Sequence, residues 1–279
     1  MTTLYLVGTP IGNLGDMSPR AIEVMRQVPL IAAEDSRVTG KLLNHFEIQT
    51  RITSFHEHNE VQKTKDLLNY LQNDDLALVS DAGMPGLSDP GYRLVRAAIA
   101  DGVKVVPVPG PSAPIAALVA SGMPVHQFTF LGYLPRRSKA RGELLKRVAA
   151  EARTAIAFES PHRLRASLED IDRVLPKTQV VIARELTKLH EEFLRGTANE
   201  LLEMIQARKL KGEITLVIGA SEKQDHQEWT EDKIQTLILE HLANGLGTAE
   251  TARLVAAESG MARRELYQLV AELQQRTKQ

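Results

Sequence analysis

LALVSDAGMPGLSDPG occupies positions 76–91 and has the pattern of a buried strand that runs into a long glycine- and proline-rich loop. Four consecutive apolar residues are typical of a strand in a parallel sheet. Open α/β sheets bind ligands beyond the carboxyl ends of their strands, and glycine lets a backbone approach a ligand closely. We therefore expect residues 80–83 to contact a ligand. Asp89 and Pro90 have the pattern of a helix cap followed by a first-turn proline.

Short apolar runs alternate with amphipathic segments on both sides of this stretch. Strands are expected at residues 4–7, 30–33, 52–55, 76–79 and 103–108, with helices at 19–27, 39–46, 61–71 and 91–100. A second series has strands at 128–132, 154–158, 179–183, 191–195 and 214–218, and helices at 113–121, 138–149, 161–174 and 198–206. This alternation predicts an α/β fold with a largely parallel sheet.

The pattern suggests three domains. We expect an N-terminal α/β domain at residues 1–112, a C-terminal α/β domain at 113–222 that ends in a polar linker at 221–228, and a helical extension at 223–279. The extension has helical periodicity at 231–243, 248–258 and 262–274, and its last two helices, joined around residues 259–261, resemble a helix-turn-helix. From residue 222 onward it holds seven basic and ten acidic residues, so we expect it to pack or dock rather than bind phosphate.

Composition excludes several classes of site. The 279 residues are 43% hydrophobic and 25% charged, as in a soluble globular protein. The absence of cysteine excludes disulfides, a thiol nucleophile and a cysteine-based metal site. No apolar run approaches the roughly 18 residues of a membrane helix. We expect a cytoplasmic protein without membrane contact, while the net charge of −1 argues neither for nor against nucleic acid.

Two further loops follow expected strands. Residues 8–15, GTPIGNLG, match neither the Walker pattern GxxxxGK[ST] nor the dinucleotide pattern GxGxxG, which argues against both ligand classes. Residues 109–113, PGPSA, precede an expected helix that Ser112 is able to cap. Because the carboxyl ends of parallel strands share one edge of a sheet, we expect these loops and residues 80–91 to form one crevice.

Polar clusters suggest two further sites. Residues 136–147 hold six basic residues and one acid, Glu143, and follow an expected strand. A solvated helix face is the usual interpretation of such a run, but its place near the crevice favours contact with a phosphate backbone. Arg165, Arg184 and Lys188 extend this surface, although an internal ion pair of Arg184 with Glu185 is an alternative. His56 and His58 would share one face of an extended segment, yet no third ligand has metal-site spacing, so we expect no metal.

Nine ordered segments resemble the tetrapyrrole methylase superfamily, in particular its subfamily that methylates small-subunit ribosomal RNA. The resemblance covers residues 4–218 and extends to the helical tail. The segments are GTPIGNLGDMSPRA, AEDSRVTGKLLNHF, SFHEHNE, SDAGMPGLSDPG, PVPGPSA, FLGYLPRR, FESPHRL, ARELTKLHEE and KGEITLVI.

The resemblance implies that S-adenosylmethionine is the methyl donor, bound without a metal in the cleft between two α/β domains of a homodimer. It implies transfer to the ribose 2′-hydroxyl of a cytidine in the decoding region of small-subunit (16S) ribosomal RNA, free or in the assembled subunit. At Met84 the subfamily usually has threonine, which removes a hydroxyl contact but leaves backbone contacts. The donor residues implied are Pro10, Asp81, Ala82, Gly83, Met84, Leu87, Ser112, Ala113, Phe158, Glu159, Leu186, Gly212 and Glu213.

A ribose hydroxyl is a weak acid, so its methylation benefits from a proton acceptor. Glu159, His162, Glu185 and Lys188 are candidates. We favour Glu185 or Lys188 because both follow a strand end on the basic side, and we expect no acceptor in residues 80–91. The residues expected to bind RNA are Arg136, Arg137, Lys139, Arg141 and Arg163.

Two alternatives are methylation of a tetrapyrrole carbon and a non-catalytic role in ribosome assembly. The basic stretch and the helical tail weigh against a tetrapyrrole, which needs neither. The aromatic content of 4% leaves few platforms for base stacking and disfavours a general single-strand binder.

Overall fold

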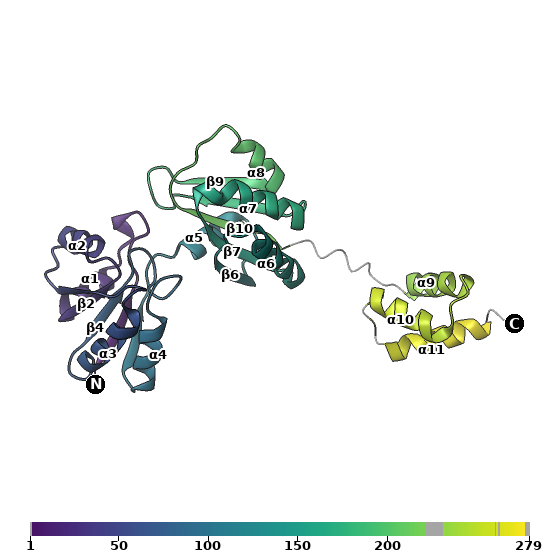
Figure 1. The fold of residues 1–279 in the computed structure, drawn as a ribbon, viewed down its shortest axis with the longest axis horizontal. Coiled ribbons are helices and arrows are strands. Elements are labelled where there is room, and N and C mark those ends of the chain that lie inside the picture. The colour runs from purple at the N-terminus through teal and green to yellow at the C-terminus, as the bar shows by residue number, and fades with distance from the viewer. Residues whose placement is uncertain (1, 221–230, 260, 262, 277–279) are drawn as a thin grey trace. The chain divides into compact units, whose positions relative to one another are not determined.

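A computed structural model of the chain describes residues 2–220, 231–259, 261 and 263–276. The chain forms two compact units, Met1–Ser221 and Glu222–Gln279 (Figure 1). The linker predicted at residues 221–228 and Gly260 in the predicted turn lie outside the described residues. The larger unit contains two five-stranded sheets covered by helices, which confirms the predicted α/β class. Among the described helices, none has the length and apolar character needed to cross a membrane.

The first sheet is parallel throughout and has the order β3-β2-β4-β1-β5. Every strand therefore ends at the same edge. The central strand β4 is buried along its whole length, which explains its unbroken apolar sequence. The strands are β1 (Thr3–Val7), β2 (Leu30–Ala33), β3 (Arg51–Ser54), β4 (Leu76–Val79) and β5 (Lys104–Val108).

Helices cover both faces of this sheet (Figure 1). Because side chains alternate along a strand, Ala77 and Val79 pack with α1 (Pro19–Gln27) and α2 (Ser36–His45). Leu76 and Leu78 pack on the other face with α3 (Glu60–Tyr70) and α4 (Tyr92–Ala100). A short 3-10 helix, η1 (Leu14–Asp16), was not expected from the sequence.

The second sheet has the order β6-β7-β10-β8-β9. Its β6–β7 pair is parallel, whereas β10 is antiparallel to β7 and β8, and β8 is antiparallel to β9. The expectation of a largely parallel sheet is therefore wrong for this half. Strands β8 and β9 follow each other without an intervening helix, so they pair antiparallel. The strands are β6 (Phe128–Tyr133), β7 (Thr154–Glu159), β8 (Gln179–Arg184), β9 (Glu192–Thr197) and β10 (Ile214–Ile218).

Three helices, α6 (Ser138–Glu151), α7 (Pro161–Val174) and α8 (Ala198–Met204), pack on one face of the second sheet. The other face packs against α5 (Ala113–Ser121). Ile11, from the loop after β1, joins Leu118 and Val217 in that second cluster. The loop of the first sheet is thus anchored in the core of the second.

The smaller unit contains α9 (Glu231–Ala243), α10 (Thr248–Ser259) and α11 (Arg263–Arg276), as the helical periodicity predicts. Ile238, Val255, Leu266 and Val270 are buried together in its core. The helices therefore form a hydrophobic core of their own.

The start of α4 differs from the prediction. The helix begins at Tyr92, its N-cap is Gly91 with a φ of 142°, and no side chain caps it. A Cβ atom at Gly91 would lie 2.9 Å from the Leu78 side chain, so the chain enters the helix through a position that only glycine fits. The prediction that Asp89 caps this helix is wrong.

Backbone contacts join the loops that follow β1, β4 and β5. Thr9 and Gly83 exchange two hydrogen bonds, of 2.9 and 3.1 Å, and the Gly8 amide donates to the Val108 carbonyl at 3.1 Å. A Cβ atom at Gly8 would lie 2.7 Å from the Gly110 Cα atom, and one at Gly110 would lie 2.8 Å from the Gly8 backbone. Neither position has room for a side chain. The three loops therefore form one surface.

Gly110→Ala is expected to lower the free energy of unfolding by about 1–3 kcal/mol, because the added methyl group meets the Gly8 backbone rather than a movable side chain. Gly40→Ala is the control: Gly40 lies inside α2 with open space around it, so alanine should raise stability by up to about 1 kcal/mol. Urea denaturation followed by circular dichroism measures both. Wild-type stability of Gly110→Ala would contradict the tight loop packing.

Candidate active site

A cavity of about 380 Å³ lies where the strand-end loops of the first sheet meet the second half of the larger unit. Its size falls within the range of about 300–1,000 Å³ that is typical of small-molecule sites. We call it the central cavity. Its lining consists of residues 81–84, 87–89, 112–114, 158–161 and 212–215 together with Ile11, Glu34 and Tyr133.

Most residues predicted to hold the donor line this cavity. Of the thirteen, the structure places all but Pro10 and Leu186 in the lining. Pro10 is next to the lining residue Ile11, and Leu186 is buried against Ile11 in the cluster beneath α5. The structure brings the predicted residues together, and their contact with a donor stays a prediction.

The loop after β4 has an unusual backbone. Gly83 and Gly86 have φ values of 83° and 82°, which glycine adopts readily. Ser88 has a φ of 69° although it carries a side chain, which costs about 1–3 kcal/mol. Such strain is common at functional sites, and both Ser88 and its neighbour Asp89 line the cavity.

The cavity is acidic. Its lining includes the carboxylates of Glu34, Asp81, Asp89, Glu159 and Glu213 and no lysine, arginine or histidine. Within the described residues, Glu34, Asp81 and Asp89 form no ion pair with a basic group. The charge of the cavity therefore favours a cationic ligand over a phosphorylated one.

Burial raises the pKa of several of these groups. It is the main cause of the raised pKa of Glu34 and of Asp81, which lie together: the Asp81 amide donates to a Glu34 carboxylate oxygen at 3.3 Å. Burial, followed by repulsion from Glu34 and a smaller repulsion from Asp81, raises the pKa of Asp89 to about 6. Burial also raises the pKa of Tyr133, with Glu213 and Asp89 as further causes. Asp89 thus titrates just below neutral pH.

Glu185 and Lys188 lie beside the cavity rather than in its lining. The Lys188 ammonium is 2.9 Å from Glu185 and 3.2 Å from Glu213, and the Glu185 carboxylate accepts the Glu213 amide at 3.0 Å. The hydrogen bond from Lys188 holds the pKa of Glu185 below its usual value. Burial disfavours the charged form of Lys188, but Glu185 and Glu213 outweigh it and raise its pKa. The lowered pKa makes the Glu185 carboxylate a weaker proton acceptor, and the raised pKa keeps Lys188 protonated at neutral pH, so its ammonium has no site for a further proton.

Glu159 belongs to an internal network. Its carboxylate is 2.5 Å from the Arg163 guanidinium, and it accepts hydrogen bonds from the Ser167 hydroxyl and the Ser160 amide. Arg163 also donates to the Leu134 carbonyl at 3.3 Å. This network fixes the start of α7 next to the cavity and occupies the Arg163 guanidinium.

The other four residues predicted to bind RNA fall into two groups. Arg136, Arg137 and Lys139 are exposed, and none of the three side chains has an ion-pair partner in the described part of the chain. Arg141 is only 3% exposed, pairs with Asp170 at 2.5 Å and donates to the Pro135 and Ala166 carbonyls. A buried guanidinium that is already paired is not accessible to a phosphate, so we no longer include Arg141 among the residues proposed to bind RNA.

Sequence reasoning missed Glu34, Asp89 and Tyr133 as cavity residues. Glu34 directly follows β2 and Tyr133 ends β6, so the strand-end rule applied to those two strands would have found them. Asp89 was assigned to the cap of α4. The His56 and His58 rings have centroids 6.0 Å apart, and among the residues described no group of three metal-ligating side chains is close enough to hold a metal ion.

The sequence matches the family Tetrapyrrole (Corrin/Porphyrin) Methylases over residues 3–202. Among solved structures, diphthine synthase is similar with a TM-score of 0.64 and 15% identity, over 78% of this chain and 90% of that one, which supports the fold.

Two relatives are similar over almost their whole length. Ribosomal RNA small subunit methyltransferase I of Synechocystis sp. is 46% identical over 98% of this chain and 99% of its own. The protein of the same name from Escherichia coli O157:H7 is 46% identical over 97% of this chain and 95% of its own. The chain therefore belongs to the tetrapyrrole (corrin/porphyrin) methylase family and, within it, to the ribosomal RNA small subunit methyltransferase I proteins.

Proposed function

We propose that this methyltransferase transfers the methyl group of S-adenosylmethionine to the ribose 2′-hydroxyl of a cytidine in the decoding region of small-subunit (16S) ribosomal RNA. The observation that carries the proposal is the 46% identity, over 98% of the chain, to a relative named ribosomal RNA small subunit methyltransferase I. The geometry and charge of the central cavity support the choice of donor.

The cavity suits a cationic donor. S-adenosylmethionine carries a sulfonium and an ammonium group, and it supplies a methyl group that is already activated for transfer. Glu34, Asp81 and Asp89 would hold its positive charge, while Gly83 and Met84 present backbone and apolar surface. The absence of basic side chains from this lining disfavours triphosphates and dinucleotides, in agreement with the loop sequences.

The larger unit would contribute alignment. Residues from both halves line the cavity, and the joined loops after β1, β4 and β5 fix one wall of it. Holding two reactants in line lowers a barrier by about 7–11 kcal/mol in favourable cases. The oxygen–carbon bond forms as the carbon–sulfur bond breaks, and the hydroxyl proton passes to a base.

We assign the role of that base to Asp89. It lies in the cavity lining, is half-buried and has no cationic partner among the described residues. The groups around it are Glu34, Asp81, the Ser80 hydroxyl and Tyr133, so no basic side chain holds its carboxylate. Its pKa of about 6 leaves it ionised at neutral pH and more basic than an ordinary aspartate. This assignment departs from two expectations of the sequence, that Glu185 or Lys188 takes the proton and that residues 80–91 contain no acceptor.

The exposed residues Arg136, Arg137 and Lys139 would contact the RNA backbone. A homodimer and a cytoplasmic location are parts of the proposal that follow from the family resemblance.

Incubation with radiolabelled S-adenosylmethionine is expected to label 16S ribosomal RNA in small subunits from cells that lack this protein. Nuclease digestion and mass spectrometry should place the methyl group on a cytidine ribose. Protein-free 16S RNA in a parallel reaction shows whether assembly is required. Uroporphyrinogen III is the control acceptor, and label on it instead of RNA would overturn the proposal.

Asp89→Asn is expected to lower kcat on the order of a hundredfold or more, because the amide keeps the shape but cannot take a proton. Calorimetric titration with S-adenosylmethionine separates this loss from weaker donor binding. Glu185→Gln and Lys188→Met are matched variants, both expected to keep most of their turnover. Full turnover in Asp89→Asn, with loss in the other two, would return the role to Glu185 or Lys188.

The pH profile gives a second check on Asp89. A base with a pKa of about 6 is protonated below that pH, so wild-type kcat should fall as the pH drops through about 6. The stability of the fold should instead rise as the pH drops, because an ionised buried carboxylate destabilises the folded state and its protonation removes that cost. Asp89→Asn should therefore melt at a higher temperature than the wild type at pH 8, and this advantage should disappear near the unfolded-state pKa of about 3.9. A wild-type rate that stays flat between pH 5 and 8 would contradict the assignment.

A further inference from the structure

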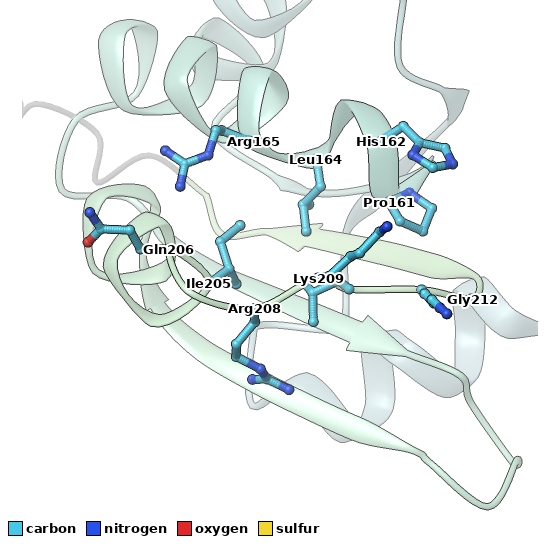
Figure 2. Close-up of a pocket in the computed structure, with 11 residues that line it drawn as sticks. Pro161, His162, Leu164, Arg165, Ile205, Gln206, Arg208, Lys209 and Gly212 are labelled. Carbon is cyan, nitrogen blue, oxygen red and sulfur yellow. The ribbon is translucent and has the colours of Figure 1, made fainter.

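A second recess, of about 650 Å³, lies between α7 and the segment that connects α8 to β10 (Figure 2). Its floor is apolar and consists of Leu164, Ile205 and Leu210. Its walls carry five basic side chains and no acidic one: His162, Arg165, Arg208, Lys209 and Lys211. We call this recess the basic groove.

Three of these cations are available to a ligand. Arg165, Lys209 and Lys211 are exposed, and their side chains have neither an ion-pair nor a hydrogen-bond partner within the described residues. Arg208 differs, because its guanidinium is 2.7 Å from Glu192. In Figure 2, Lys209 extends toward the α7 side of the groove, whereas Arg208 points to the opposite side.

The segment that carries the lysines is held at both ends. The ion pair of Arg208 with Glu192 anchors its start. At its end, the Lys211 carbonyl accepts a hydrogen bond from Arg184 at 3.1 Å, and the Glu213 amide donates to Glu185 at 3.0 Å. These contacts use backbone groups and Arg208, so they fix the segment and leave the ammonium groups of Lys209 and Lys211 free.

The groove adjoins the central cavity, because Pro161 and Gly212 line both recesses. A polymer with one unit in the central cavity is therefore able to place the neighbouring units in the groove. His162, a candidate proton acceptor from the sequence, is among the residues that line the groove and not among those that line the cavity.

We propose that the basic groove binds the single-stranded RNA next to the methylated nucleotide, with Arg165, Lys209 and Lys211 on its phosphates. The assignment rests on the proposed function, which places the target ribose in the central cavity. Free cations over an apolar floor fit a strand whose phosphates face the rim and whose sugars face inward. Because the lining contains no phenylalanine, tyrosine or tryptophan, the groove reads the backbone rather than the base sequence.

Lys209→Ala/Lys211→Ala is expected to weaken binding of a fluorescein-labelled single-stranded RNA that spans the decoding region. Loss of two phosphate contacts should reduce the slope of log affinity against log salt by about 1.4, at roughly 0.7 per contact on a single strand. The KM for small subunits should rise, while kcat and the calorimetric donor affinity stay at wild-type values. Arg165→Ala is a second variant that should reduce the slope by about half as much.

Lys41→Ala/Lys65→Ala is the matched control, because it removes the same charge from exposed positions on α2 and α3. It should leave the slope and the KM unchanged. An unchanged slope in both the groove variants and the control, with methylation intact, would refute the RNA assignment but not the proposed function. Lack of RNA methylation by a wild-type protein that binds S-adenosylmethionine would instead refute the proposed function.

Discussion

The close approach of the Gly8 and Gly110 backbones, together with the Thr9–Gly83 hydrogen bonds, is the constraint on which the rest of the larger unit depends. Parallel strands bring their ends to one edge, but they do not by themselves press the loops together. Here the absence of side chains lets three loops merge into a rigid wall. Ile11, carried by the first loop, then packs into the core of the second half, so the wall and the opposite side of the cavity share one hydrophobic cluster.

The local sequence pattern predicted most of the helices and strands, because burial and turn formation depend on residues that are close in sequence. It predicted neither the mixed strand direction of the second sheet nor the positions of Asp89 in the cavity and of Arg141 in the interior. An apolar run such as residues 214–218 looks the same in either direction. Asp89 faces a cavity that only the folded chain creates, and Arg141 is buried by Asp170, which lies far along the sequence. The loop sequences predicted most residues of the central cavity, but they did not predict Glu34, which follows another strand and adds to the negative charge of the cavity.

Opposite charges lie in adjacent recesses of the larger unit. The central cavity has three carboxylates without cationic partners, and the basic groove has three cations without anionic ones, within the residues described. Two carboxylates of the cavity lining, Glu159 and Glu213, form ion pairs with Arg163 and Lys188. These pairs neutralise part of the negative charge on the side of the cavity that adjoins the basic groove. A cationic small molecule and a polyanion are thereby directed to different places without competing for one surface.

The partnerless carboxylates of the central cavity have a consequence for turnover. Methyl transfer converts a sulfonium into a neutral thioether, so the spent donor carries one positive charge fewer than the fresh one. The carboxylates of Glu34 and Asp81 attract the two molecules unequally, so the attraction weakens at the moment of reaction, and a proton taken up by Asp89 weakens it further. The charge of the cavity thereby favours exchange of the spent donor for a fresh one.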